Sequence, residues 1–247
     1  MDPGSRDPDG SLGRDDNRVV KPLGCPAMKP QAVEEFYRRL AEARPEPETE
    51  LEYRNVYTLL VAVVLSAQAT DVGVNRATKK LFAEIDNPAG MVALGEEGLK
   101  QHIKTIGLFN TKAKNVIALS KLLIERHGGE VPRGHDELQA LPGVGRKTAN
   151  VVRNVAFGEE TIAVDTHIFR VSNRTGLAPG KTPEKVEEKL MKVTPAKYRR
   201  HAHHWLILHG RYTCKAGKPN CPNCSVLEFC AYRKKTKPEP PLPVRKR

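Results

Sequence analysis

Apolar residues recur at intervals of three and four along most of the chain between about residue 28 and residue 236. This spacing places apolar side chains on one face of an α-helix. No convincing run alternates apolar and polar residues with the period of two that a half-buried strand shows. The pattern predicts an all-α fold of eight to ten short helices. The spacing is clearest in residues 32–43, 56–68, 74–85, 96–107, 113–128, 186–194 and 202–214.

Glycine and proline mark where several of these helices end or begin. Gly107 and the pair Gly128-Gly129 are predicted to end helices, because glycine readily takes the left-handed conformation that follows a helix. Thr182-Pro183 is predicted to begin one, with proline at the first helical position.

Both ends of the chain differ in composition from the helical region. Residues 1–27 are rich in Asp, Gly, Pro and Arg and have few large apolar residues, so we predict a disordered N-terminal tail. From Arg233 onward basic residues alternate with proline, and residues 237–247 are predicted to form a basic C-terminal tail. This tail would either attract phosphate without sequence preference or serve only solubility.

The net charge restricts the class of partner. Lys and Arg number 41 against 29 Asp and Glu, which gives a net charge of +12 and a pI of about 9.5. This balance favours a polyanion such as nucleic acid, although a solvated basic surface has the same composition. The longest apolar run, residues 59–67, is far shorter than the roughly 20 residues of a membrane span. We therefore expect no membrane association and a cytoplasmic location.

The stretch LPGVGRKTAN places a glycine turn between two predicted helices. Gly143 and Gly145 can take positive φ angles and, lacking Cβ atoms, are expected to let a phosphate approach closely. The phosphate would meet backbone N–H groups where the second helix begins, near Arg146 or Lys147. Val144 and Arg146 belong to the same predicted DNA contact. An ordinary turn between two antiparallel helices would have similar glycines.

Two residues near this turn have the chemistry of a catalytic pair. Lys147 is predicted at a helix N-terminus, where the helix dipole disfavours a cation. With Arg146 adjacent and partial burial, we expect more of the neutral amine, which is a nucleophile able to form a Schiff base. Eighteen residues later, the apolar residues 162–164 lead to Asp165 at the start of another helix, a position typical of an N-cap. An aspartate there can cap the helix and also take part in catalysis.

Four cysteines within seventeen residues predict a metal centre. Cys214, Cys221, Cys224 and Cys230 have the spacing C-x6-C-x2-C-x5-C. In a chain expected to be cytoplasmic, this favours metal ligation over disulfide bonds. The spacing alone is compatible with zinc or with a [4Fe–4S] cluster, although zinc sites usually contain two close pairs of cysteines.

Other residues near the cysteines could take part in binding. Lys215 and Lys218 lie inside the first cysteine interval, so the metal would fold a small basic loop that we expect to contact phosphate. Four cysteines already fill a metal site, so core or surface roles are expected for the nearby histidines, which are His201, His203, His204 and His209.

These motifs, together with VDTHIFRVSNRTGLAPG and HHWLILHGRYTC, resemble the endonuclease III family of helix-hairpin-helix DNA glycosylases and AP lyases. The resemblance extends from about residue 28 to residue 232. It implies a [4Fe–4S] cluster on the four cysteines and two interleaved helical domains with a DNA cleft between them. Residues 49–159 would form a six-helix barrel with the hairpin, and residues 28–48 and 160–236 would form the cluster domain.

The resemblance also implies roles for individual residues. Lys147 corresponds to the nucleophile that attacks C1′ of the damaged nucleotide, and Asp165 to the aspartate that assists departure of the base. Gln68 and Leu108 correspond to residues that enter the duplex where the base has left. Without the resemblance they would be interpreted as a polar helix-surface residue and a core residue at a helix end. Asp71 corresponds to an aspartate near the pocket, to which we assign no role.

The implied activity is removal of oxidised pyrimidines from duplex DNA, followed by strand cleavage at the abasic site. A base inside a duplex is out of reach, so the enzyme would extrude it at a cost of a few kcal/mol. Lysine attack would leave an imine at C1′, which permits β-elimination of the 3′ phosphate. The expected partner is double-stranded DNA with an oxidised pyrimidine or an abasic site. We expect a monomer that acts on the nucleoid in a bacterial cytoplasm.

Two other functions share part of this sequence pattern. A monofunctional adenine-removing mismatch glycosylase has the hairpin, the aspartate and the cysteine spacing. It usually lacks the lysine and has a further C-terminal domain, and both Lys147 and the chain length of 247 residues disfavour it. A non-catalytic helix-hairpin-helix DNA-binding protein would need the hairpin and the basic charge but not Lys147 and Asp165 together.

Overall fold

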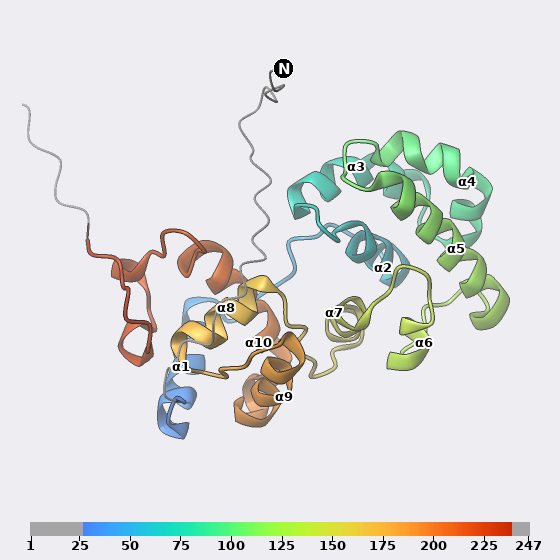
Figure 1. Ribbon diagram of the computed structural model, residues 1–247. Coiled ribbons are helices and arrows are strands. Elements are labelled where there is room, and N and C mark those ends of the chain that lie inside the picture. The colour runs from blue at the N-terminus through green and yellow to red at the C-terminus, as the bar shows by residue number, and fades with distance from the viewer. Residues whose placement is uncertain (1–26, 239–247) are drawn as a thin grey trace, which may run out of the picture.

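The computed structural model describes residues 27–238 of the chain, and those residues form helices and connecting loops without any strand (Figure 1). This confirms the predicted all-α fold, and ten α-helices in the described part lie within the predicted number. Their bounds are α1 Pro30–Ala43, α2 Val56–Leu65, α3 Asp71–Glu84, α4 Pro88–Ile103, α5 Phe109–His127, α6 His135–Gln139, α7 Arg146–Phe157, α8 Thr166–Thr175, α9 Pro183–Val193 and α10 Ala196–Leu208.

Helices α2 to α7 surround one apolar core (Figure 1). Helix α2 is its centre, and every residue from Tyr57 to Leu65 is buried. A helix that is apolar on all sides is stable only when neighbours cover it on all sides. Its start is defined by a capping box, in which the Asn55 side chain accepts from the Thr58 N–H at 2.9 Å and the Thr58 hydroxyl accepts from the Asn55 N–H at 2.9 Å.

Helix α1 packs with α8, α9 and α10 around a second apolar core. The chain therefore begins its described part in this unit, builds the first core, and returns after α7 (Figure 1). Buried polar contacts join its distant segments. Tyr37 and Thr194 share a hydrogen bond of 2.9 Å, and the Trp205 indole N–H donates to the Arg44 carbonyl at 2.7 Å. Satisfied polar groups of this kind hold α1 against the C-terminal helices.

Several predicted helix ends are wrong for identifiable backbone reasons. Helix α2 ends at Leu65 instead of residue 68, because Gln68 has a left-handed φ of 54°. Helix α4 begins at Pro88, earlier than predicted, and its first part is separated by a kink at Gly95, where φ is 73°. It ends at Ile103, so Gly107 does not end a helix. The predicted C-terminal segment 202–214 is α-helical to Leu208 and continues as a π-helix over His209–Thr213, so its predicted end is confirmed to within one residue.

Other predicted boundaries are confirmed. Gly128 follows α5 in the left-handed conformation, with φ of 60°. Thr182 caps α9 by accepting from the Lys185 N–H, with Pro183 at the first helical position. No helix of residues 27–238 is long and apolar enough to span a membrane. The predictions for the two tails concern residues almost all of which lie outside the described part, so they stay predictions.

Candidate active site

The glycine turn connects α6 to α7, as predicted. Gly143 has a φ of 79°, which favours glycine, and an added Cβ atom there would lie 3.0 Å from atoms of the Asn115 side chain. The conformation therefore favours glycine at this position, and the close Asn115 side chain adds to the preference. Helix α7 begins at Arg146, which confirms the predicted start of the second helix.

Gly145 is the N-cap of α7. Its φ is −91° and its ψ is 176°, an extended conformation that any residue can adopt, so Gly145 does not use the positive φ that glycine allows. An added Cβ atom would meet no atom within 4 Å. The fold therefore does not require glycine here. What the glycine leaves is open space beside a helix N-terminus, where unpaired N–H groups attract an anion.

The two other predicted contacts in the turn are already engaged within the protein. Val144 has a buried side chain, and its N–H donates to the Leu141 carbonyl at 3.0 Å. The Arg146 side chain is half exposed, and its guanidinium forms an ion pair of 2.7 Å with Glu187 on α9. The hydrogen bond and the charge of Glu187 raise the pKa of Arg146. Neither residue has a side chain that projects freely toward an approaching phosphate.

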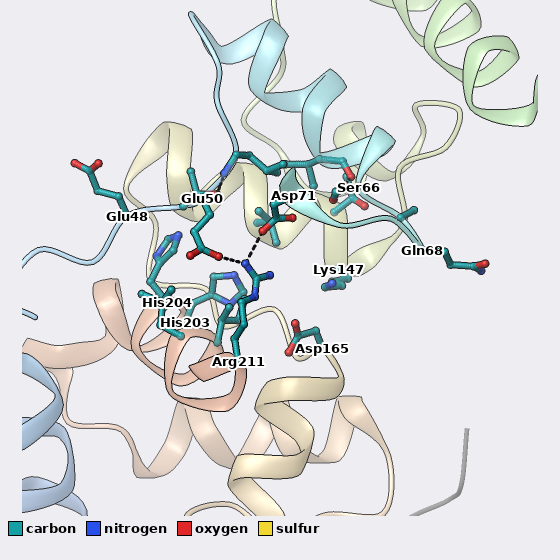
Figure 2. Close-up of a pocket in the computed structure, with 18 residues that line it drawn as sticks. Glu48, Glu50, Ser66, Gln68, Asp71, Lys147, Asp165, His203, His204 and Arg211 are labelled. Carbon is teal, nitrogen blue, oxygen red and sulfur yellow. Dashed lines mark hydrogen bonds and ion pairs between the residues drawn. The ribbon is translucent and has the colours of Figure 1, made fainter. Parts of the chain in front are cut away.

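Lys147 and Asp165 line the same pocket, and Figure 2 shows their side chains pointing toward one another. Lys147 follows the N-cap of α7 by two residues and is exposed, so the predicted partial burial is wrong. Buried residues 162–164 lead to Asp165, whose side chain caps α8 by accepting from the Ile168 N–H at 2.8 Å. The capping bond orients the carboxylate at the pocket.

The pocket lies where the two apolar units meet, since its walls come from both (Figure 2). Helix α2 and the start of α3 supply one wall, and α10 with the turn after it supplies another. Its polar and charged lining includes Glu48, Glu50, Ser66, Gln68, Asp71, Lys147, Asp165, His203, His204 and Arg211.

Two of the histidines in this lining are buried and uncharged. Burial is the main cause that lowers the pKa of His203 well below its ordinary value, because burial disfavours the charged form. Burial likewise lowers the pKa of His204 to about 4. His203 and His204 therefore have the predicted core role, but they also line the pocket.

Gln68 and Leu108 share an unusual backbone conformation. They are the two residues other than glycine that have a positive φ in the described part of the chain, at 54° and 59°. Such conformations cost free energy and concentrate at functional sites. Gln68 lines the pocket, and the Leu108 side chain is 59% exposed. Leu108 is thus not the helix-end core residue that its position alone suggests.

The four cysteines surround one small cavity. Burial is the main cause that raises the pKa of the Cys224 thiol to about 11; a backbone hydrogen bond opposes the rise, and the other three cysteines contribute to it. The sulfurs are thus close enough to interact electrostatically. Among residues 27–238, however, no three His, Cys, Asp or Glu side chains converge closely enough to hold a single metal ion. The four thiols nevertheless line one shared cavity.

The loop between the first two cysteines is exposed, and its backbone is held by hydrogen bonds from an arginine. Lys215 and Lys218 are both exposed. Arg174 at the end of α8 donates to the carbonyls of Lys215 and Ala216, each at 2.7 Å, and its guanidinium lies over the Tyr232 ring. Arginine contacts to carbonyls therefore support the backbone that presents the two lysines.

Comparison with known proteins identifies the family. Residues 61–196 match the HhH-GPD superfamily of base excision DNA repair proteins. Endonuclease III of Escherichia coli strain K12 is 59% identical over 201 residues, which cover 81% of this chain and 95% of that protein. Endonuclease III of Rickettsia conorii is 58% identical over 205 residues, which cover 83% and 98%. This chain belongs to the endonuclease III family.

Solved structures agree with this assignment. A trapped covalent intermediate of endonuclease III with DNA is 46% identical, with a TM-score of 0.77 over 82% of this chain and 96% of that chain. A non-covalent complex of endonuclease III with DNA is also 46% identical, with a TM-score of 0.78 over 82% and 95%. The predicted resemblance to the endonuclease III family is therefore confirmed. The chain is a DNA glycosylase and AP lyase of base excision repair.

Three charged residues in the pocket of this endonuclease III family member were not predicted from the sequence, namely Glu48, Glu50 and Arg211. Glu48 and Glu50 lie in an irregular segment where Glu alternates with other residues, and nothing local distinguishes them from Glu52. Arg211 lies seven residues after His204, a spacing that places both on one face of a continued helix. The position of all three at the pocket depends on contacts with distant segments.

Proposed function

We propose that this glycosylase and AP lyase removes oxidised pyrimidines from duplex DNA and cleaves the strand through a Schiff base on Lys147. The observation that carries the proposal is the position of Lys147 and Asp165 in one pocket, facing one another, beside a hairpin whose helix N-terminus is open to an anion. The trapping of a related endonuclease III as a covalent intermediate with DNA supports a nucleophile of this kind. A non-catalytic DNA-binding protein would not need this pair.

The proposed DNA site lies across the meeting line of two domains. Residues 49–159 would form the barrel domain, and residues 28–48 with 160–236 would form the cluster domain. The two separate apolar cores support this division, because the first contains residues from Leu51 to Val152 and the second contains α1 together with the helices after α7. A DNA strand bound across the boundary between the two domains would pass both the pocket and the start of α7.

Phosphate binding at the hairpin would come from the backbone. Gly143 provides the turn, and Gly145 provides the open space through which a phosphate reaches the first N–H groups of α7. Gln68 and Leu108 would enter the duplex where the base leaves. Their positive φ angles support this role, because an ordered left-handed residue presents its side chain in advance of binding.

The chemistry would begin with attack of the neutral Lys147 amine on C1′ of the extruded nucleotide. The bond between C1′ and the base breaks, and the base leaves with its bonding electrons and takes up a proton. Ring opening gives an imine between C1′ and Lys147, which makes the C2′ protons acidic. Loss of one of them expels the 3′ phosphate, and water then releases the lysine. Asp165 would support the positive charge that develops during base departure.

We propose that Cys214, Cys221, Cys224 and Cys230 hold a [4Fe–4S] cluster. The four thiols around one cavity fit such a group. None of the four cysteines lines the pocket that contains Lys147, so the cluster would have a structural role and no part in the reaction. It would order the loop from which Lys215 and Lys218 contact phosphate.

The pocket and hairpin are complete within one chain, which supports action as a monomer on the nucleoid of a bacterial cytoplasm. The strong positive charge of +12 supports association with DNA there. Analytical ultracentrifugation with and without duplex DNA would test the stoichiometry.

The decisive experiment is borohydride trapping on two duplexes, one with an oxidised thymine and one with an abasic site. Lys147→Gln should abolish trapping on both, while DNA affinity stays within about tenfold of wild type, because binding and covalent chemistry depend on different groups. Strong trapping by Lys147→Gln on abasic DNA would show that another amine is the nucleophile.

Asp165→Asn tests the second member of the pair. Asparagine is as good an N-cap as aspartate, so the start of α8 should be preserved. The amine also remains, so trapping on abasic DNA should persist. Turnover of the damaged base should fall by about 10² to 10⁴, because charge support for base departure is lost. If turnover is unchanged, Asp165 serves only as the N-cap of α8 and has no catalytic role.

A further inference from the structure

Three charged residues from distant parts of the chain form an ion-pair network in the pocket, on the wall near Lys147 and Asp165 (Figure 2). Glu50 lies in the segment between α1 and α2, and Asp71 is the first residue of α3. Arg211 lies in the π-helical turn His209–Thr213 that continues α10. We call Glu50, Asp71 and Arg211 the pocket network.

The pocket network has hydrogen-bonding capacity left over. Arg211 Nη1 contacts Asp71 Oδ2 at 2.7 Å and also Glu50. A guanidinium has five N–H donors, and these two contacts engage only one of its three nitrogens. Tyr212 donates to the other carboxylate oxygen of Glu50 and so fixes that side chain from outside. Exposed fractions of 29%, 33% and 19% for Arg211, Glu50 and Asp71 show that a ligand in the pocket can reach all three.

The charge of the pocket network excludes a phosphate as its partner. Burial alone would lower the pKa of Arg211, but the hydrogen bonds and charges of Asp71 and Glu50 outweigh burial and raise it. The guanidinium is therefore charged, and with two carboxylates the network has a net charge of −1. In a chain of net charge +12 this is a local negative site. It suits an uncharged group that has N–H or O–H donors as well as acceptors.

An extruded pyrimidine is a group of that kind. A thymine-derived base presents a carbonyl, an N–H and a second carbonyl along one edge, and oxidation of the ring can add hydroxyl donors. A carboxylate accepts from the N–H or the hydroxyl, and a guanidinium donates to a carbonyl. We propose, resting on the proposed function above, that Glu50, with Arg211 and Asp71, determines specificity by hydrogen-bonding the extruded base.

The same contacts could instead serve only to join the two domains, because Arg211 belongs to one apolar unit and Asp71 to the other. The two roles differ in what they predict for a substrate without a base. A joining role affects base excision and abasic-site cleavage alike. A base-reading role affects excision alone, because an abasic site leaves nothing for the network to bind.

The test measures single-turnover rates on two duplexes of one sequence, one with the oxidised base thymine glycol and one with an abasic site. Glu50→Gln removes the charge and one acceptor but keeps the side-chain length. It should slow excision of thymine glycol by about tenfold or more, since a donor of the base loses its charged acceptor. Cleavage of the abasic duplex should stay within about twofold of wild type.

Glu52→Gln is the matched control, because Glu52 is exposed in the same segment and lies outside the pocket lining. It should change neither rate. Tyr212→Phe should slow excision less than Glu50→Gln, because the carboxylate and its pair with Arg211 remain. Equal slowing on both duplexes by Glu50→Gln would show that the network only joins the domains. No slowing on either would show that Glu50 does not contact the base. If the wild-type protein cleaves neither duplex, the proposed function itself fails.

Discussion

Arg146 at the start of α7 is held by Glu187 on α9, with 2.7 Å between the guanidinium Nη2 and the carboxylate Oε1. Asn150, one turn further along α7, donates to the same carboxylate oxygen at 3.3 Å. The carboxylate therefore joins the hairpin to the neighbouring unit, and it occupies the arginine that the sequence places beside a phosphate. Glu187 and a DNA phosphate compete for one guanidinium.

Replacing Glu187 by Gln should free Arg146 for the backbone of DNA. We expect binding to undamaged duplex to tighten by about threefold. The slope of log affinity against log salt should steepen by up to roughly one unit, because one further phosphate is neutralised. Fluorescence anisotropy over a salt series measures both. Glu188→Gln is the control, since Glu188 lies on the same helix but pairs with Lys185 at 3.0 Å. A response equal to that of Glu188→Gln would show that Arg146 does not reach DNA.

Gly145→Asp should weaken binding to damaged and undamaged duplex alike. The aspartate side chain would project into open space, so the fold should be unaffected, but its bulk and charge would oppose a phosphate at the start of α7. Gly145→Ala, which adds bulk without charge, should have a smaller effect. Thermal unfolding checks that both variants keep wild-type stability. If Gly145→Asp binds both duplexes with wild-type affinity, the hairpin does not contact DNA.

The exposed lysines of the cysteine loop should bind phosphate without reading sequence. Replacing both Lys215 and Lys218 by Gln should flatten the slope of log affinity against log salt by up to about two units. Relative rates on different damaged bases should stay the same. The absorption spectrum of the purified variant checks that the metal centre is intact. An unaltered salt slope would mean that this loop faces away from DNA.

Acid should destabilise the protein through His204. Its pKa is about 4 in the fold against an ordinary value of 6.5, because burial disfavours the charged form. Between these two values the unfolded chain binds a proton that the folded protein does not, so stability falls as the pH falls. From pH 7 to pH 5 we expect His204 to account for about 2 kcal/mol of lost unfolding free energy.

The measurement is denaturant unfolding of wild type and His204→Gln at both pH values. The variant should be less stable at pH 7 but should lose about 2 kcal/mol less than wild type on acidification. Taking the difference between the two proteins cancels the other groups that titrate in this range. Equal losses would contradict the buried, neutral state of His204.

The helical fold and the local motifs follow from the sequence alone. Apolar spacing of three and four residues specifies helices wherever one face is buried, and α1, α3, α5, α9 and α10 lie where that spacing predicts. The hairpin turn and the four cysteines are contained in short stretches, so their chemistry can be recognised without knowledge of distant contacts. Helix ends were less predictable, because single backbone conformations at Gln68 and Gly95 decide them.

The way in which these pieces form a site depends on tertiary packing. Glu50 and Asp71 lie 161 and 140 residues from Arg211, and no spacing rule connects positions so far apart. The exposure of Lys147 and the open space at Gly145 likewise depend on which elements pack nearby, and the predicted partial burial of Lys147 was wrong. Secondary structure follows from short-range periodicity, which the chain contains explicitly. The pocket results from packing two apolar cores against each other, so its lining is defined by contacts between residues that are neighbours only in the folded protein.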